Sequence, residues 1–595
     1  MKKDIRDIKE KKEELKKTFK VKLNGKFVLS YEGETVLALA RRNKINIPSF
    51  CHHPDLSIKA NCRVCVVEIK GAVKLKTSCS TFVEEGMEII TNNERVLRAR
   101  KTNLELIYAS HVERCGTCSS RFDCNLLETA KEYELKITRF KDRKKTRKTY
   151  KFANAVEIDG TQCIDCRNCI EACVNQGVDY LELKGNGIEQ EIVPKKDKKF
   201  ACVYCGQCAL HCPVASAQEQ DQSLALEKLL KQKASGKKVV VQFAPAVRVS
   251  LGESFGLPYG TNCEGKIVSA LKKLGFDYIF DINFAADITT MTEAEEFMER
   301  LSDKKAVWPM TTSCCPAWVA YAEFYHPELL PHLTTARSPH IHGGGAIKAY
   351  WAKEKKIKSE DIIVVSVVPC TAKKYEAIRP ELKYKGKPLV DFVLTTRELA
   401  FLIKKNKIDF LGLSDGKLDP LFNEGSGAAA IYGASGGVME SALRSVASFV
   451  CEKGKDPLCD ARLEFKEVRG LEGIKEAKVE LGGKKFNLAV VNGLGNFKKI
   501  LPNFKKYHYI EIMACPGGCL GGGGQPIPTT KEIKKKRLEG LYNLDKKRSI
   551  RRAHENKEML ASYNFAKENK LEAQLLHTKF KKSKGSILTT TKDNH

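Results

Sequence analysis

The segment IIVVSVVPC, residues 362–370, joins a run of apolar residues to a proline and a cysteine. A short apolar run of this kind, interrupted only by Ser366 and bounded by proline, is typical of a strand buried on both faces. Five further apolar runs alternate with helical patterns, at 239–243, 278–282, 306–310, 488–491 and 507–513. Since strands that alternate with helices form parallel sheets, residues 236–528 are expected to fold as an α/β domain.

Three of these runs lead into loops that contain cysteine. Cys315 lies in TSCCPAW (312–318), Cys370 in VPCTAK (368–373), and Cys515 and Cys519 in MACPGGC (513–519). Ligand sites in parallel sheets lie beyond the carboxyl ends of the strands, so the three loops are expected to meet in one crevice. Four thiolates from distant loops suit one iron–sulfur cluster. The second cysteine beside Cys315 and the glycines around Cys519 indicate that this cluster carries a more reactive group.

Composition limits the class of protein. At 595 residues the chain is too long for one hydrophobic core, so several domains are expected. No apolar run approaches the ~18 residues of a transmembrane helix, so no membrane span is expected. The 23 cysteines crowd the first 220 residues, and residues 1–20 are charged and lack the apolar core of a secretory signal. Cysteines in such a chain indicate metal ligation in a reducing compartment, so a cytoplasmic location is expected. Import into an organelle stays open, although the N-terminus does not support it.

The formal net charge is +29. One interpretation is a lysine-rich surface that is only solvated. A second is a surface that attracts an acidic partner by electrostatic steering. Nucleic acid is not expected as a partner, because no basic and aromatic recognition motif accompanies the charge.

The N-terminal part contains four cysteines with the spacing C-x10-C-x2-C-x13-C. A short C-x2-C between two outlying cysteines is similar to the ligation of a 2Fe–2S cluster. The ligands would be Cys51, Cys62, Cys65 and Cys79. Alternating apolar and polar residues around them, with a short helix near 36–40, predict a small β-rich ferredoxin fold.

A second set places one histidine before three cysteines, as His111, Cys115, Cys118 and Cys124. Residues 95–130 around it are expected to be helical. Taken alone, the set fits zinc as well as iron–sulfur ligation, since zinc accepts one histidine and three cysteines. Its position between two other iron–sulfur motifs favours a 4Fe–4S cluster.

Two copies of the pattern C-x2-C-x2-C-x3-C follow and form an internal repeat. In two-cluster bacterial ferredoxins, the fourth cysteine of each copy ligates the cluster of the other copy. One cluster is therefore expected on Cys163, Cys166, Cys169 and Cys212, and the other on Cys202, Cys205, Cys208 and Cys173. Such clusters perform no chemistry on a substrate, and they conduct single electrons to a reactive site.

Together, the three cysteine loops resemble the signature segments of the iron–iron (FeFe) hydrogenases, and the preceding motifs resemble those of the large, clostridial-type members. The resemblance extends from about Val21 to about Glu555. It implies a multidomain α+β and α/β fold. The implied parts are a charged helical extension (1–20), a β-grasp 2Fe–2S ferredoxin-like domain (21–94), a one-His-three-Cys cluster domain (95–139), a two-cluster ferredoxin domain (140–222), a two-lobed α/β catalytic domain with mostly parallel sheets (236–528), and a C-terminal helical extension whose tail frays after Phe580 (529–595).

The resemblance also implies an activity, the reversible reduction of protons to molecular hydrogen at an H-cluster. This cofactor is a 4Fe–4S cluster linked to a two-iron unit with CO, cyanide and azadithiolate, and one 2Fe–2S and three accessory 4Fe–4S clusters accompany it. Cys315, Cys370, Cys515 and Cys519 would hold the 4Fe–4S part, and Cys519 would bridge to the two-iron unit. Lys373 would donate a charge-assisted hydrogen bond to a cyanide. The other implied pocket residues are Ala244, Pro245, Ala246, Ser338, His340 and Met513.

Protons have to reach the two-iron unit singly. Cys314 is not needed as a ligand, and it matches the thiol that transfers protons to the azadithiolate amine. A free thiol titrates near pH ~8.5, so it can release and recover a proton near neutrality. Glu293, Glu296, Thr334 and Arg300 match a relay from this thiol to the surface. The two glutamates are three residues apart and therefore lie on one helix face.

Three residues depart from the family pattern. Val368 stands where a methionine often precedes the Pro-Cys pair, so gas access, oxygen sensitivity or catalytic bias could differ. Thr334 replaces the usual relay serine but keeps the hydroxyl. Ala317 replaces a frequent glycine.

Three other interpretations fit parts of this pattern. An iron–sulfur assembly or sensor protein would share the four-cysteine frame, but such relatives tend to lack the complete first loop, so Cys314 and Lys373 argue against it. An electron-transfer subunit like that of respiratory complex I would share only the first 220 residues. The interpretation as a subunit of a bifurcating or NAD(P)-linked complex stays open, because the partner subunit would determine that function. This chain itself shows no dinucleotide-binding pattern, since residues 433–437 do not form G-x-G-x-x-G. Ferredoxin, or a similar acidic electron carrier, is the expected partner.

Overall fold

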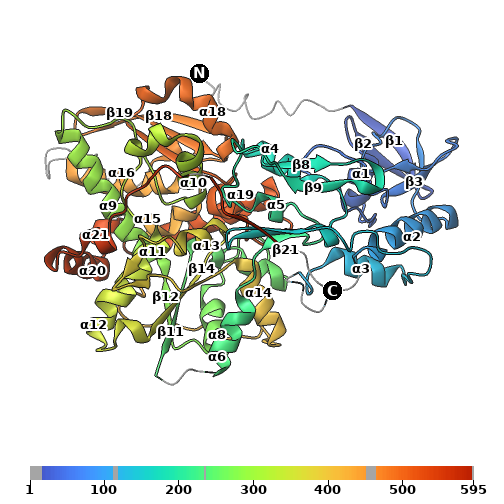
Figure 1. Cartoon of the computed structure of the whole chain (residues 1–595). Helices are drawn as coiled ribbons and strands as arrows, with labels where there is room; N and C mark the ends of the chain where they lie inside the picture. Colours follow the sequence, from blue (N-terminus) through green and yellow to red (C-terminus); the bar gives the residue numbers. More distant parts are fainter. Residues whose placement is uncertain are drawn as a thin grey trace, which may run out of the picture. The chain divides into compact units, whose positions relative to one another are not determined.

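The computed structural model describes residues 17–111, 115, 118, 120–232, 236–450, 464–583 and 585–591. These residues divide into two units. The first unit holds the described residues up to Arg147, together with Gly160–Asn168 and Lys184–Ile192. The second holds Lys148–Asp159, Cys169–Leu183 and the described residues from Val193 onward. Figure 1 labels the elements of both units along the chain.

The first unit begins with a mixed sheet of five strands in the order β2-β1-β5-β3-β4. β1 and β5 are parallel, and the other neighbouring pairs are antiparallel. Helix α1 (Val36–Arg42) starts at Thr35, whose side chain accepts the backbone N–H of Ala38, and its apolar face packs on the sheet. The strands are β1 (Thr18–Leu23), β2 (Lys26–Tyr31), β3 (Val66–Ile69), β4 (Lys76–Thr77) and β5 (Glu88–Ile90).

Two predictions for this unit need correction. Residues 1–16 of the expected helical extension lie outside the described residues, and Thr18–Lys20 belong to β1 instead of a helix. The region 95–130, expected to be helical, contains two helices, α2 (Glu94–Ala109) and α3 (Asn125–Glu132), and His111 lies after the first of them. The second helix, α3, starts at Cys124, which has an extended backbone. The Cys124 sulfur accepts the N–H of Leu127 at 3.4 Å and so caps the helix.

The second unit contains a parallel sheet in the order β12-β11-β14-β17, as the alternating strand and helix patterns predict. Its strands are β11 (Lys238–Phe243), β12 (Tyr278–Asp281), β14 (Ile362–Val367) and β17 (Phe392–Leu394). Val239 and Val241 of β11 pack in one core with helices α6 (Ser223–Gln232), α8 (Glu264–Leu274) and α14 (Thr396–Lys405). Val240, between them, faces the other core. Helices therefore cover both faces of the sheet, and this burial explains the continuous apolar runs.

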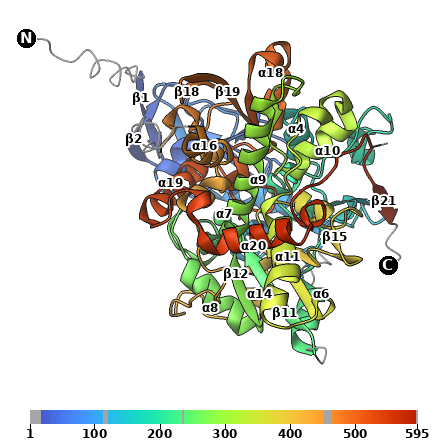
Figure 2. The ribbon, with the colours of Figure 1, turned by 90° about the vertical axis from the view of Figure 1, so that its left-hand side faces the viewer.

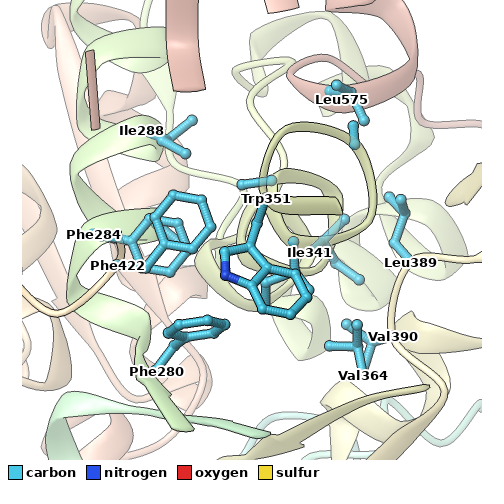
Figure 3. Close-up of a cluster of buried hydrophobic side chains, with 14 of the residues drawn as sticks. Phe280, Phe284, Ile288, Ile341, Trp351, Val364, Leu389, Val390, Phe422 and Leu575 are labelled. Atoms are coloured by element: carbon cyan, nitrogen blue, oxygen red, sulfur yellow. The ribbon is translucent and has the colours of Figure 1, made fainter. Parts of the chain in front are cut away.

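The core on the second face surrounds Trp351, which is fully buried. Figure 3 shows its ring between Phe280 and Ile341, and the Phe280 and Trp351 centroids lie 5.6 Å apart in an edge contact. Helices α9 (Ile282–Ser302) and α11 (Pro339–Ala346) supply much of this core. α9 continues beyond the part that packs in this core, and its later turns include the buried Glu293.

A second sheet of this unit has the order β13-β20-β19-β18. β13 (Met310–Thr311), β20 (Tyr509–Met513) and β19 (Lys484–Asn492) are parallel, and β18 (Ile474–Leu481) is antiparallel to β19. The predicted strand over 306–310 is wrong, since the strand begins at Met310 and the residues before it include Pro309, which has no N–H to donate to a ladder. β17 and β18 were not predicted: β17 has three residues, and β18 is an edge strand with several exposed charged side chains.

A third sheet joins distant parts of the second unit in the order β10-β7-β6-β21. β21 (Leu588–Thr591) pairs antiparallel with β6 (Thr149–Phe152), so the prediction that the tail frays after Phe580 is wrong for this segment. The other strands are β7 (Val156–Asp159) and β10 (Ala217–Glu219). The C-terminal helices are α19 (Lys531–Lys547), α20 (Lys557–Glu568) and α21 (Glu572–Leu575), and Figure 2 shows α20 crossing in front of α11.

The remaining elements are short or link these layers. They are α4 (Asn168–Asn175), β8 (Leu181–Lys184), β9 (Glu191–Pro194), α5 (Gln207–Leu210), α7 (Pro245–Arg248), α10 (Pro316–Tyr325), α12 (Ala352–Glu354), α13 (Ala372–Ala377), β15 (Lys383–Tyr384), β16 (Lys387–Pro388), α15 (Gly427–Ala430), α16 (Gly437–Val450) and α18 (Phe497–Ile500). In the described part of the chain, no helix has the length and apolar character needed to cross a bilayer.

Candidate active site

Strands of both sheets in the second unit lead into one cavity. Ala244 follows β11, Ile282 follows β12, Cys314 comes soon after β13, Val368 follows β14 and Ala514 follows β20, and all of them line it. The empty space within this lining is about 720 Å³. The cavity therefore lies at the carboxyl ends of parallel strands, where ligand sites of such sheets are found.

The four thiols predicted to hold one cluster come together at this cavity. Cys315, Cys370, Cys515 and Cys519 all line it. Burial first, and then the neighbouring Cys315, raises the pKa of Cys519 to about 11. Several buried thiolates close together are unfavourable without a compensating cation or cluster. The four thiols, gathered from three loops around an empty space, therefore fit a multi-iron cluster.

Glycines allow the loop after Cys515 to pack tightly against its neighbours. Gly518 has φ of +68°, and a Cβ on it would lie 2.8 Å from the backbone nitrogen of Ser435. A Cβ on Gly522 would collide with the carbonyl oxygen of Pro369, the residue before Cys370. The glycine-rich loop thus brings the Cys519 and Cys370 loops close to each other.

Lys373 is buried in the wall of the cavity and is held by three oxygen atoms. Its Nζ donates to Ser338 Oγ at 3.1 Å, to Glu376 Oε2 at 3.1 Å and to the carbonyl oxygen of Cys314 at 3.4 Å. His340 Nε2 lies 2.8 Å from the same Oε2 of Glu376. Burial lowers the pKa of His340 to about 4, so the ring is neutral near pH 7.

Glu376 was not predicted from the sequence. Burial acts to raise its pKa, but Lys373 and His340 lower it to about 2. The carboxylate therefore pairs with the ammonium of Lys373 inside the protein. The signal that could have indicated it is its spacing, since residues three apart share one face of helix α13.

The residues of the predicted proton relay fall into two hydrogen-bonded groups. Glu293 is fully buried, and its Oε2 accepts the Tyr509 hydroxyl at 2.7 Å. Glu296 accepts the Thr334 hydroxyl at 2.8 Å on Oε2 and Arg300 at 2.7 Å on Oε1. Tyr509 was not predicted, although it belongs to a run predicted as a buried strand.

The buried carboxyl and thiol of this region both favour their protonated forms. Burial, and then the nearby Glu296, raises the pKa of Glu293 to about 8. Burial, and then Glu293, raises the pKa of the Cys314 thiol well above its usual value. Glu293 Oε1 is buried and has no hydrogen-bond partner in the described protein. This oxygen is therefore the acceptor of Glu293 that is left for a water or a proton donor.

Most of the other residues that the resemblance assigns to the pocket line this cavity. Pro245, Ala246 and Met513 line the cavity, and so does Val368, the residue that departs from the family pattern. Ser338 does not line this cavity, but its Oγ accepts a hydrogen bond from Lys373, which does.

A separate cavity of about 400 Å³ contains four of the cysteines predicted to hold an accessory cluster. Cys173 of the first repeat lines it together with Cys202, Cys205 and Cys208 of the second repeat. The carbonyl oxygen of Cys205 lies 3.9 Å from the Sγ of Cys515. Cys205 lines this cavity and Cys515 lines the larger one, so the walls of the two cavities are in contact.

A close backbone approach separates these two cavities. Gly206 has φ of +69°, and a Cβ on it would lie 3.0 Å from the Cα of Gly523 and would collide with Thr371. Thr371 Oγ1 donates to the carbonyl oxygen of Tyr204 at 2.7 Å. Only glycine fits at position 206, because the chain is both left-handed and crowded there.

The cysteines predicted to bind the 2Fe–2S cluster form two close pairs in the first unit. The Cys51 thiol is hydrogen-bonded to that of Cys62, and the Cys65 thiol to that of Cys79. These contacts lower the pKa of Cys62 to about 6 and that of Cys65 to about 7. The same contacts raise the pKa of Cys51 and Cys79 well above the usual value, so in each pair one thiol donates and the other accepts.

The remaining predicted ligands lie as follows. His111 is buried in the first unit, and its Nδ1 is 2.9 Å from the carbonyl oxygen of Gln162, so Nε2 is the nitrogen that would bind iron. Cys115, Cys118 and Cys124 are half-buried in the same unit. Cys163 and Cys166 are buried in the first unit, and Cys169 is buried and Cys212 half-buried in the second.

Three family models match the chain. "Iron only hydrogenase large subunit, C-terminal domain" matches residues 237–523, "2Fe-2S iron-sulfur cluster binding domain" matches 16–94, and "Iron hydrogenase small subunit" matches 531–583. Iron hydrogenase 1 of Clostridium pasteurianum is 40% identical over 578 residues, which cover 94% of this chain and 99% of that protein. The chain belongs to the FeFe hydrogenase family.

Two further hydrogenases are similar to the chain. The NADP-reducing hydrogenase subunit HndD of Solidesulfovibrio fructosivorans is 38% identical over 94% of this chain and 98% of its own length. A variant of the [FeFe]-hydrogenase HydA1 from Chlamydomonas reinhardtii is 33% identical, with a TM-score of 0.54, and covers 61% of this chain and 99% of its own. This FeFe hydrogenase is therefore an H-cluster enzyme that catalyses the reversible reduction of protons to molecular hydrogen. The interpretation as a complex I-type electron-transfer subunit is wrong, because the match includes the whole cavity-bearing domain.

Proposed function

We propose that this hydrogenase exchanges electrons with ferredoxin or a similar acidic carrier and conducts them through four accessory clusters to an H-cluster in the large cavity. The observation that carries the proposal is the lining of that cavity. Four thiols, the Lys373 ammonium and the additional thiol of Cys314 face one space. When bound, the H-cluster supplies the metal chemistry of hydrogen formation and cleavage, and the protein supplies position, hydrogen bonds and exclusion of water.

The proposed ligands and contacts follow from the lining. Cys315, Cys370, Cys515 and Cys519 would hold the 4Fe–4S part, and Cys519 would also be the ligand nearest the two-iron unit. Lys373 donates to a cyanide, since an ammonium fixed by Glu376 and Ser338 is already oriented at the cavity wall. The contacts proposed for the rest of the two-iron unit are Ala244, Pro245, Ala246, His340 and Met513.

We propose that protons reach the cavity through Cys314. The thiol faces the cavity and is protonated near neutral pH, so it can donate one proton at a time. Glu293 returns a proton to it, since a buried carboxyl with a pKa of about 8 is neutral at pH 7. Thr334 and Glu296 connect Glu293 with the protein surface, and a water at Glu293 Oε1 completes the path. Arg300 holds the Glu296 carboxylate in place.

Electrons are proposed to enter the cavity from the neighbouring cluster. Its ligands are Cys173, Cys202, Cys205 and Cys208, and its Cys205 carbonyl lies 3.9 Å from Cys515 Sγ. The other proposed clusters are a 4Fe–4S cluster on Cys163, Cys166, Cys169 and Cys212, a 4Fe–4S cluster on His111, Cys115, Cys118 and Cys124, and a 2Fe–2S cluster on Cys51, Cys62, Cys65 and Cys79. So many cysteine ligands suit a reducing compartment, and we propose a cytoplasmic location.

Anaerobic reconstitution with iron, sulfide and the two-iron precursor tests the site. We expect hydrogen evolution from reduced methyl viologen together with CO bands in the infrared spectrum. Protein reconstituted without the precursor is the control and should give accessory-cluster signals but no gas. Absence of both gas and CO bands from the complete preparation would favour an assembly or sensor protein.

The identity of the electron carrier is tested by salt. With an acidic ferredoxin, the rate of electron transfer should fall about tenfold or more as ionic strength rises from 0.01 to about 0.5 M, because the net charge of +29 steers an acidic protein. Turnover with methyl viologen, which is cationic, should not fall in this way. A ferredoxin rate that stays constant across this range would contradict the proposal.

A second candidate is the catalytic subunit of a larger NADP-linked complex. It is favoured by the similarity to a subunit named as NADP-reducing over 94% of this chain. Purification of the native protein distinguishes the two. Hydrogen-dependent NADP reduction that requires a co-purifying subunit would support the complex, whereas a ferredoxin-active single chain would support the first candidate.

A further inference from the structure

The chain after α21 lies against the loop that carries the relay threonine. The backbone N–H of Thr578 donates to the carbonyl oxygen of Thr335 at 2.8 Å, and His577 forms an isolated β-bridge with Ala336. These backbone contacts hold the His577 side chain at a fixed position beside Thr335.

A continuous path of side-chain hydrogen bonds leads from Glu296 to this histidine. Thr335 Oγ1 donates to Glu296 Oε2 at 3.1 Å, and the same hydroxyl is 2.8 Å from Nδ1 of His577. The backbone N–H of Thr335 also donates to Glu296 Oε2, at 2.8 Å. Two hydrogen bonds therefore connect the imidazole with the outer carboxyl of the proposed relay.

The outer end of this path meets a surface cavity. Its empty space is about 1780 Å³, and both Thr335 and His577 line it, together with Lys579, Lys581 and Lys582. His577 is half-buried and lines this space, and its Nδ1 contacts the Thr335 hydroxyl. Solvent can exchange protons with the ring there.

A histidine provides what the other partners of Glu296 lack. The Arg300 guanidinium remains protonated in proteins, so it stabilises the carboxylate but does not deliver a proton. The hydroxyls of Thr334 and Thr335 pass a proton only if another group supplies one. Imidazole is the side chain that takes up and releases protons near neutral pH.

We propose that His577 is the proton-exchange residue at the surface end of the relay, which rests on the relay proposed above. A proton from water binds Nε2, and the Nδ1 proton moves to Thr335 Oγ1 as the hydroxyl proton moves to Glu296 Oε2. One proton is transferred, no electrons move, and the ring returns to its starting tautomer by exchange with water.

Other charged and titratable groups surround the imidazole. Arg337 Nε donates to the His577 carbonyl oxygen at 2.8 Å and contributes a positive charge. His342 is buried, and burial lowers its pKa to about 3, so it is neutral near pH 7. Glu296 on α9 and Glu381 in the wall of the surface cavity contribute negative charge. Lysines of the same wall add positive charge beside them.

The deciding experiment uses the complete enzyme with His577→Asn. Asparagine places an amide N–H where Nδ1 stood, so the hydrogen bond to Thr335 is kept but proton exchange is lost. We expect hydrogen evolution at pH 8 to fall about tenfold, with a smaller loss at pH 6. The thermal unfolding midpoint and the infrared bands of the cofactor should not change. The matched control is His326→Asn, another half-buried histidine, which should keep wild-type turnover.

Chemical rescue gives a second readout. In His577→Gly, added imidazole should restore turnover, and crystals of this variant without the two-iron unit should show imidazole hydrogen-bonded to Thr335. Wild-type turnover of His577→Asn at both pH values would overturn the proposal. The proposal would also fail if His577→Gly is impaired, binds imidazole and still does not regain turnover. If Glu296→Gln also keeps full turnover, the relay itself fails. If only Glu296→Gln is impaired, the relay stands and His577 has no part in it.

Discussion

Cys314→Ala is expected to keep the iron content of the enzyme and to lower hydrogen evolution by about 10²-fold or more. The thiol lines the cavity but is not among the four proposed ligands, so its removal leaves the cluster in place. Without it, the nearest group of the proposed relay is Glu293, which is separated from the cavity. The measurements are iron content, the CO bands in the infrared and turnover with reduced methyl viologen.

Two controls separate proton transfer from packing. Cys314→Ser keeps nearly the same volume, but a hydroxyl releases its proton far less readily than a thiol, so turnover should stay low. Cys263→Ala removes a buried thiol whose Sγ donates to the Arg248 carbonyl oxygen at 3.2 Å, away from the cavity, and should keep turnover. Full activity of Cys314→Ala would remove this thiol from the mechanism.

Motifs that act locally were the most predictable part of the site. The cysteine loops follow strands whose apolar runs identify them, so the meeting of Cys315, Cys370 and Cys515 at one cavity could be predicted from parallel-sheet topology. Cys173 beside the second repeat was also predictable, because the spacing of the two copies specifies crosswise ligation. In both cases a short segment and a general rule sufficed.

Contacts between distant segments could not be predicted. The hydroxyl of Tyr509 meets a carboxylate 216 residues earlier in the chain, and His577 meets a threonine 242 residues earlier. Neither pair has a spacing, a motif or a periodicity that marks it, since both depend on how sheets and the C-terminal segment pack. β18 is different, because Ala477, Val479 and Leu481 alternate with exposed charged residues, and this period of two is a local signal of a strand.

Glu293→Gln is expected to lower turnover in both directions by about 10²-fold or more, while the fold is kept. Glutamine has the size of glutamate and still accepts the Tyr509 hydroxyl, which donates to Oε2 at 2.7 Å in the structure. It cannot bind and release a proton. The loss would therefore report proton transfer and not the loss of a buried hydrogen bond.

The pH dependence gives an independent check on Glu293. Its pKa of about 8 means that the carboxyl is protonated below pH 8 and ionises as the pH rises through that value. Hydrogen evolution by the wild type should therefore fall across this range, because the donor to Cys314 is lost, and Glu293→Gln should lack this inflection. Glu511→Gln is the control, since Glu511 contributes to the raised pKa of Glu293 without bonding to it. It should move the inflection to lower pH and keep turnover, whereas an unchanged inflection in Glu293→Gln would assign it to another group.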